Sequence, residues 1–132
     1  MRQDARDSAS RPPQVARLDE TVYAVWCEDA AGSAAVRQAH LDGHLRHIEA
    51  NFERYLVAGP MRRDGAERLT GSFLLVVAAS EAEARALMEE DPYVRHGAYV
   101  RVEIRAVTPA AGRWLGGVIW SSADDLRSRA AG

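Results

Sequence analysis

Three of the four histidines in this 132-residue chain fall in one short segment, at positions 40, 44 and 47. Histidine is the side chain whose ordinary pKa lies closest to neutral pH, so it is the first candidate for moving a proton. The carboxylate expected to pair with it is Asp91, because Pro92 disfavours helical geometry at the preceding residue and so places Asp91 at a turn. A carboxylate beside an imidazole fixes the tautomer of the ring and raises its pKa, which gives a general acid or base that works near neutral pH. These residue types point to proton transfer.

Within the histidine segment, His44 is the favoured proton-transfer residue. The segment carries apolar residues at i, i+4, i+7 and i+11, which predict one apolar helix stripe packed on a sheet: Leu41, Leu45, Ile48 and Phe52. A second stripe, rotated by about 90° from the first, holds Arg37, His40, His44, His47 and Asn51. His44 borders the apolar stripe, so we expect it to be the most desolvated histidine. The alternative is a structural His44 that hydrogen-bonds at the seam of a dimer.

The three clustered histidines also have the spacing of metal ligands on a helix, since residues at i, i+4 and i+7 can face one ion. The intervening residues Leu41-Asp42-Gly43 lack the glutamate of a zincin motif, so a solvated histidine face is the simpler interpretation, and we expect no metal. All 17 basic residues are arginine, and the absence of lysine excludes a cofactor held as an imine. We expect no other cofactor.

Composition limits the class of protein. A net charge of −2 and a pI near 6.1 give no general attraction to phosphate backbones, so nucleic acid is not an expected partner. The sequence has no apolar run close to the roughly 20 residues that span a bilayer, and its amino terminus lacks the apolar stretch of a secretory signal. We expect a soluble, cytoplasmic protein with no membrane partner. The single cysteine, Cys27, lies in an apolar run and is expected to be a buried, inert thiol.

The residue patterns predict one α+β domain. Four apolar or alternating runs are predicted strands, over 21–28, 55–58, 71–79 and 99–107. Ser33 is the predicted cap of a long helix that ends near residue 53, and Ser80 with Glu83 fits a capping box that opens a second helix to about residue 90. The order is β-α-β-β-α-β, the split arrangement of a ferredoxin-like sheet with both helices on one face. The first strand is apolar on both faces and is expected to be central.

The sheet face opposite the helices needs a cover. Two such sheets packed face to face would supply it, so we predict a homodimer. The domain is expected to occupy residues 19–108. Residues 1–18 have few apolar side chains and are expected to form a flexible leader. Residues 109–132 are expected to be a C-terminal extension whose Trp114 and Trp120 are candidates for completing the dimer.

Several short motifs carry a resemblance to a known family. In chain order they are the Arg37 to Leu45 histidine segment, Leu56-Val-Ala-Gly59-Pro60, Gly71-Ser72 and Asp91-Pro92-Tyr93, of which the last is the most specific. On these motifs the chain resembles the YCII-related (YciI-like) family over about residues 21–107. The resemblance implies a fold similar to dimeric α/β-barrel proteins such as muconolactone isomerase. It also implies a histidine and an aspartate with a catalytic role.

Two histidines match the family histidine. Arg37-x-x-His40-Leu41 matches the Arg-x-x-His-Leu residue pattern of the family, whereas His44-Leu45 matches the family's spacing to Ala58-Gly59-Pro60. We favour His44, and the family aspartate corresponds to Asp91. Residues expected to contact the substrate are Arg37, His40, Ser72 and Tyr93. The resulting prediction is an isomerase, lyase or dehalogenase-like enzyme that acts on a small cyclic or enol-capable metabolite; the alternative is a noncatalytic ligand-binding or interaction module with structural histidines.

Overall fold

The computed structural model describes residues 11–131, so residues 1–10 of the expected leader lie outside the described residues. The chain divides into two compact units. The first is residues 20–107, and the second combines the residues that precede and follow it. All residues expected in the site belong to the first unit.

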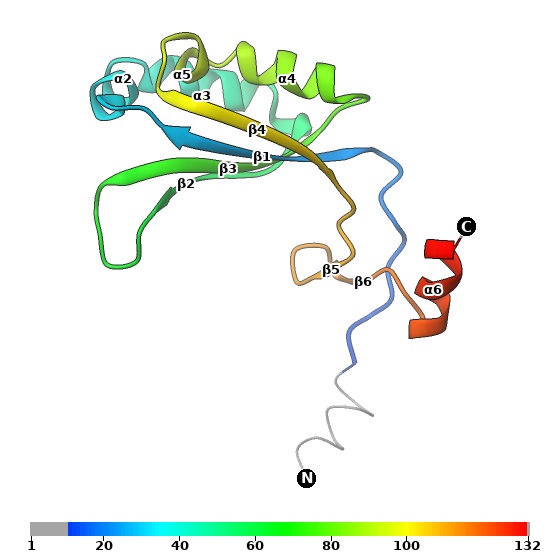
Figure 1. Ribbon diagram of the computed structural model, residues 1–132. Helices are drawn as coiled ribbons and strands as arrows, with labels where there is room; N and C mark the ends of the chain where they lie inside the picture. The colour runs from blue at the N-terminus through cyan, green and yellow to red at the C-terminus, as the bar shows by residue number, and fades with distance from the viewer. Residues whose placement is uncertain (1–10, 132) are drawn as a thin grey trace. The chain divides into compact units, whose positions relative to one another are not determined.

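A four-stranded sheet forms one layer of the first unit (Figure 1). Its strands are β1 (Val22–Asp29), β2 (Tyr55–Arg62), β3 (Leu69–Val77) and β4 (Tyr99–Val107). They lie in the order β2-β3-β1-β4, and every neighbouring pair is antiparallel. Strand β1 pairs with a strand on each side, so the prediction of a central first strand is confirmed.

The helices of the first unit lie over one face of the sheet (Figure 1). They are α2 (Ser33–Ala39), α3 (Leu41–Ala50), a single 3₁₀ turn (Phe52–Arg54), α4 (Glu81–Glu89) and α5 (Pro92–Arg95). Helices α2 and α3 connect β1 to β2, and α4 and α5 connect β3 to β4, so the predicted β-α-β-β-α-β order is confirmed. Over the part of the chain that the structure describes, no helix combines the length and the apolar character needed to cross a bilayer.

The prediction of one continuous helix over 33–53 is wrong, because the backbone breaks at His40. This residue has φ −115° and ψ 18°, ends α2 and precedes α3. The residue before α2 is Gly32, with φ 79°, a left-handed conformation that glycine adopts without strain. Ser33 is therefore not the cap, and its hydroxyl instead donates to Asp29 at 2.8 Å.

Of the predicted apolar stripe of α3, Ile48 alone packs against the core. Three of its members are exposed: Leu41, Leu45 and Phe52. Helix α3 instead turns histidines inward, because Asp91 and Tyr55 offer them hydrogen-bond partners there. The expectation that His44 is the most desolvated histidine is also wrong. His47 is 8% exposed, whereas the His44 side chain keeps 19% of its surface.

Strand β2 continues past its predicted end at Gly59-Pro60 and runs to Arg62. Proline has no N–H to give to a ladder, but β2 is an edge strand, where proline is tolerated. In the β2–β3 register Pro60 lies opposite Ser72 and Met61 lies opposite Gly71. Two motifs that are separate in the sequence are thus neighbours in the sheet.

The core of the first unit lies between the sheet and the helices. It is built mainly from β1, β3 and α4: Val25, Cys27, Leu74, Val76, Ala84, Leu87 and Met88. Helix α4 begins as predicted, since the Ser80 hydroxyl accepts the backbone N–H of Glu83 at 3.1 Å. Cys27 is buried, as predicted, and burial raises the pKa of its thiol to about 12. The thiol therefore stays protonated at neutral pH.

The second unit contains β5 (Ala111–Gly112), β6 (Gly117–Val118) and α6 (Ala123–Ala131). Part of the expected leader pairs with it. The Val15 N–H donates to the Val118 carbonyl at 2.7 Å, and the Val118 N–H donates to the Pro13 carbonyl at 2.9 Å. Sequence reasoning did not predict this pairing, because backbone hydrogen bonds between distant segments leave no mark on side-chain composition.

Deleting residues 1–18 should free the Val118 amide while leaving the sheet intact. The deletion removes the carbonyl that accepts the Val118 N–H, so this amide should exchange with solvent at close to the rate of an unstructured chain. The melting temperature should fall by less than about 4 °C, because the deleted segment contributes little apolar burial. Hydrogen exchange and circular dichroism on the full and shortened chains measure both. Continued protection of Val118, or a larger fall, would contradict this expectation.

Candidate active site

His44 on α3 and Asp91 ahead of α5 are hydrogen-bonded to each other. The His44 Nδ1 lies 2.9 Å from Oδ1 and 2.8 Å from Oδ2 of Asp91. Asp91 is buried, with an exposed fraction of 1%. An ionised carboxylate only accepts hydrogen bonds, so the ring nitrogen next to it must be the donor. This assigns the proton of the neutral His44 ring to Nδ1. The other ring nitrogen, Nε2, is then unprotonated in the neutral ring. It is free to accept a proton from a bound molecule.

Local sequence places Asp91 for this contact. Its Oδ1 accepts the Tyr93 N–H at 2.9 Å and so caps the short helix α5, with Pro92 in the first helical position. The turn predicted at Asp91 thus lies between the end of α4 and the start of α5. Helix α3 approaches α5 closely at Gly43, where an added Cβ would lie 3.0 Å from Pro92 Cγ. The glycine before His44 therefore lets the two helices come near enough for the His44–Asp91 hydrogen bond.

Tyr93 holds the imidazole from one side. Its ring stacks on the His44 ring with a centroid distance of 3.9 Å and an interplanar angle of 4°. The Tyr93 hydroxyl donates to the backbone carbonyl of Arg37 at 3.2 Å. The ring of His44 is therefore fixed by a carboxylate at one nitrogen and by an aromatic face.

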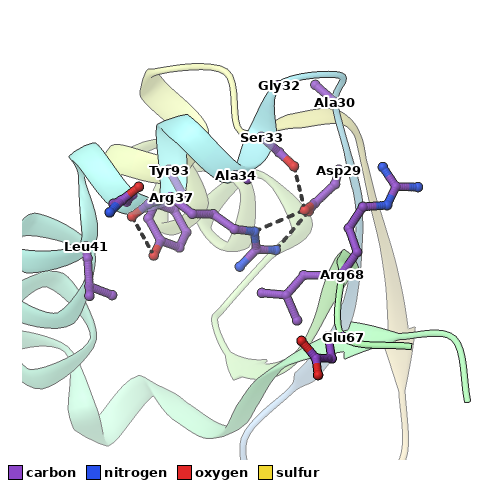
Figure 2. Close-up of a pocket in the computed structure, with 12 residues that line it drawn as sticks. Asp29, Ala30, Gly32, Ser33, Ala34, Arg37, Leu41, Glu67, Arg68 and Tyr93 are labelled. Carbon is purple, nitrogen blue, oxygen red and sulfur yellow. Dashed lines mark hydrogen bonds and ion pairs between the residues drawn. The ribbon is translucent and has the colours of Figure 1, made fainter. Parts of the chain in front are cut away.

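Arg37 on α2 forms a partly buried ion pair with Asp29 at the end of β1 (Figure 2). Its Nε donates to Oδ2 at 3.0 Å and its Nη2 donates to Oδ1 at 2.8 Å, while the side chains are 11% and 6% exposed. Nη2 also donates to the Ser72 hydroxyl at 3.1 Å, and Ser72 is hydrogen-bonded to the Tyr99 hydroxyl at 2.9 Å. Burial is the largest single effect on the Arg37 guanidinium and lowers its pKa, but the hydrogen bond to Asp29 together with the charges of Asp29, Tyr93 and Tyr99 leaves the pKa raised. Arg37 is therefore a fixed positive charge.

These side chains meet at a cavity of about 380 Å³, a size suited to a small cyclic molecule. Its walls are largely apolar, with Leu41, Leu45, Ile48, Leu69, Leu74 and Pro60 among them. Its polar members are Arg37, His44, Ser72, Tyr93 and Tyr99. A second cavity of about 470 Å³, shown in Figure 2, shares Arg37 and Tyr93 with the first and extends to Asp29, Ser33 and Arg68.

The structure brings most of the expected site residues together. Arg37, His44, Ser72 and Tyr93 line one cavity, and Asp91 lies against His44. His40 lines neither of the two cavities described above. Its ring stacks on the ring of His96 at 3.8 Å, because the helix break turns it away from His44. The clustered histidines thus have separate partners, and within residues 11–131 no three His, Cys, Asp or Glu side chains are grouped to hold a metal ion.

Sequence reasoning missed two residues of the site, Asp29 and Tyr99. Asp29 ends the central strand and Tyr99 begins the last strand, so each looks like an ordinary element end. They are paired in the β1–β4 register, next to a register shift between Glu28 and Asp29. The available signal was the central position of the first strand, because it brings Asp29 and Tyr99 to the same end of the sheet as Ser72.

His47 gives the protein a pH-dependent stability. It is hydrogen-bonded to the Tyr55 hydroxyl at 2.7 Å, and burial lowers its pKa below the ordinary value of 6.5. As the pH falls, the His47 ring is therefore protonated at a higher pH in the unfolded chain than in the folded protein. The contribution of the neutral His47 ring to folding stability is complete above about pH 6.5. It is lost as the pH falls through the folded-state pKa of His47.

Urea unfolding at pH 7.5 and pH 5.5, for the wild type and His47→Gln, should isolate this contribution. Glutamine can still hydrogen-bond Tyr55 but does not titrate, so the wild type should lose more stability than the variant on acidification. Equal losses would show that His47 does not carry the effect.

Comparison with known proteins identifies relatives of this chain. Two proteins named YciI, from Escherichia coli O6:H1 and Shigella flexneri, are each 31% identical over 91 residues, which cover 64% of this chain and 93% of theirs. A solved structure, 5-chloro-2-hydroxyhydroquinone dehydrochlorinase from Burkholderia phenoliruptrix AC1100 in complex with 2,5-dihydroxybenzoquinone, superposes with a TM-score of 0.61 at 26% identity. It covers 70% of this chain and 96% of its own. Residues 21–108 match the YCII-related domain, and the chain belongs to the YCII-related family.

Proposed function

We propose that this protein is a small-molecule enzyme in which the His44–Asp91 pair transfers a proton. The observation that carries the proposal is the hydrogen bond from His44 Nδ1 to the buried Asp91, on the wall of a cavity of about 380 Å³. Nε2 of His44 takes a proton from a hydroxyl or an acidic C–H of the substrate. The carboxylate of Asp91 stabilises the positive charge that forms on the ring.

The pair suits three related reactions. Return of the proton to another atom of the substrate is an isomerisation, and loss of a leaving group from the deprotonated substrate is a lyase or dehalogenase reaction. The solved relative with a TM-score of 0.61 is named as a dehydrochlorinase, which supports the last of these. A small cyclic molecule with an enol or phenol group has the acidic proton that all three reactions need.

The first test is chloride release from 5-chloro-2-hydroxyhydroquinone. Catalysed release above the rate without protein is the expected result, and a panel of halogenated and enolisable phenols extends the search if this compound is slow. A protein that binds 2,5-dihydroxybenzoquinone yet turns over none of the panel would favour the alternative, a noncatalytic binding module. In that case His44 is structural.

The open face of the sheet supports a homodimer as a further part of the proposal. Trp26 on β1 lies opposite Phe73 on β3, and Leu75 and Val77 follow on the same face. Trp26 is 53% exposed and the other three are only partly buried, so this apolar surface is incompletely covered in one chain. Two such sheets packed face to face would form a dimeric α/β barrel.

Sedimentation equilibrium should give a dimer at micromolar concentration for the wild type. Trp26→Glu should shift the equilibrium toward the monomer, because it places a charge in the apolar contact. Arg85→Gln is the matched control, since Arg85 lies on α4 and pairs only with an exposed Glu81. A monomeric wild type would refute the dimer without affecting the proton-transfer proposal.

A further inference from the structure

The guanidinium of Arg37 has one nitrogen that its ion pair does not use. Nε and Nη2 donate to Asp29, and Nη2 also reaches Ser72 and the Gly71 carbonyl. Among the described residues, Nη1 has no hydrogen-bond partner. Figure 2 shows the dashed lines from the Arg37 guanidinium running to Asp29.

Nη1 opens into a cavity and is not sealed in the interior. The Arg37 side chain is only 11% exposed, yet within residues 11–131 no buried side-chain nitrogen or oxygen lacks a partner. Nη1 must therefore be reachable by solvent. Arg37 lines both the cavity that contains His44 and the neighbouring one, so the accessible N–H groups of Nη1 belong to a side chain at the wall of both.

The guanidinium is held rigidly in this orientation. Asp29 fixes it through two hydrogen bonds, and Ser33 donates to the same carboxylate. The guanidinium carbon lies 5.4 Å from the Tyr93 ring centroid and 5.6 Å from that of Tyr99. A donor fixed before binding loses little entropy when a ligand arrives, so each hydrogen bond that it makes contributes more to affinity.

We infer that Arg37 Nη1 binds an anionic oxygen of the substrate, a carboxylate or an ionised enol or phenol. The assignment rests on the proposed function, because it takes the cavity of His44 as the substrate site. The surrounding walls are largely apolar, and the hydroxyl groups of the cavity already have partners, since Ser72 is hydrogen-bonded to Tyr99 and Tyr93 donates to the Arg37 carbonyl. An anion there therefore depends on this arginine. Asp29 and Ser33 are positioning residues that act through Arg37.

The test compares benzoate with benzamide, which has nearly the same shape and no charge. With ¹⁵N-labelled arginine in the wild-type protein, benzoate should shift the Arg37 Nη signals and benzamide should not. Benzoate should bind at least about tenfold more tightly than benzamide. Arg37→Gln should remove that difference, whereas Arg68→Gln, which changes an exposed arginine of the neighbouring cavity, should keep it within about twofold.

His44→Gln separates this inference from the proposed function. If Arg37 carries anion binding, the discrimination between benzoate and benzamide should survive in His44→Gln although turnover is lost. Discrimination in a wild type that turns over no substrate would leave the binding assignment standing while the proton-transfer proposal fails. Equal binding of benzoate and benzamide by the wild type, or unshifted Arg37 signals at saturating benzoate, would overturn the inference. The ¹⁵N NMR titration uses only the wild type, so it tests the inference even if Arg37→Gln does not fold.

Discussion

Replacing Asp29 with Asn is expected to lower the free energy of unfolding by about 3 kcal/mol. Asp29 is the charge partner of Arg37, and both side chains are nearly inaccessible to water. Asparagine removes the charge but not the arginine, so a largely buried guanidinium is left without its counter-ion. Breaking a buried pair in this way costs far more than the intact pair contributes.

The neighbouring residue supplies the control. Glu28 also pairs with an arginine, Arg101, but both side chains are about half exposed. Glu28→Gln should therefore change stability by less than about 1 kcal/mol. Urea unfolding of the two variants measures the difference. Similar effects at positions 28 and 29 would show that the Asp29–Arg37 pair is no more important for stability than an exposed ion pair.

Replacing His44 with Gln is expected to reduce turnover by about 10²-fold or more on any substrate of the enzyme. Glutamine is close to histidine in size and can still donate to Asp91, so the fold should persist. It cannot accept and return a proton near neutral pH, which is the role assigned to Nε2. The loss should fall on kcat, because the proton moves in the transition state.

His96→Gln is the matched control for this variant. His96 is exposed and stacks on His40, and it lines neither cavity of the site. Its replacement should leave turnover within about twofold of the wild type. Turnover by His44→Gln at the wild-type rate would remove His44 from the mechanism.

The order of elements could be predicted from sequence because each strand and helix has a local signal. Strand β4 alternates polar and apolar residues, and the Ser80 cap fixes the start of α4. The helix break at His40 has no such signal, since no proline or glycine stands at that position. The inward-facing histidines of α3 follow from the hydrogen-bond partners that other segments supply, Asp91 and Tyr55.

The candidate dyad could be predicted from one local signal and one resemblance. Asp91 was marked by the proline that follows it, and His44 by its match to the family's spacing between histidine and Ala58-Gly59-Pro60. The Asp29–Arg37 pair could not be predicted in the same way. Its geometry depends on how the end of β1 meets α2, which is settled by tertiary packing.

The most direct test of the account is the tautomer of His44. Nitrogen-15 NMR, at a pH where the ring is neutral, reports which ring nitrogen carries the proton. The account predicts the proton on Nδ1, with a downfield proton signal that is lost in Asp91→Asn, because the carboxylate that accepts it is gone. A neutral ring protonated on Nε2, or a spectrum unchanged in Asp91→Asn, would contradict the dyad and make His44 a structural residue.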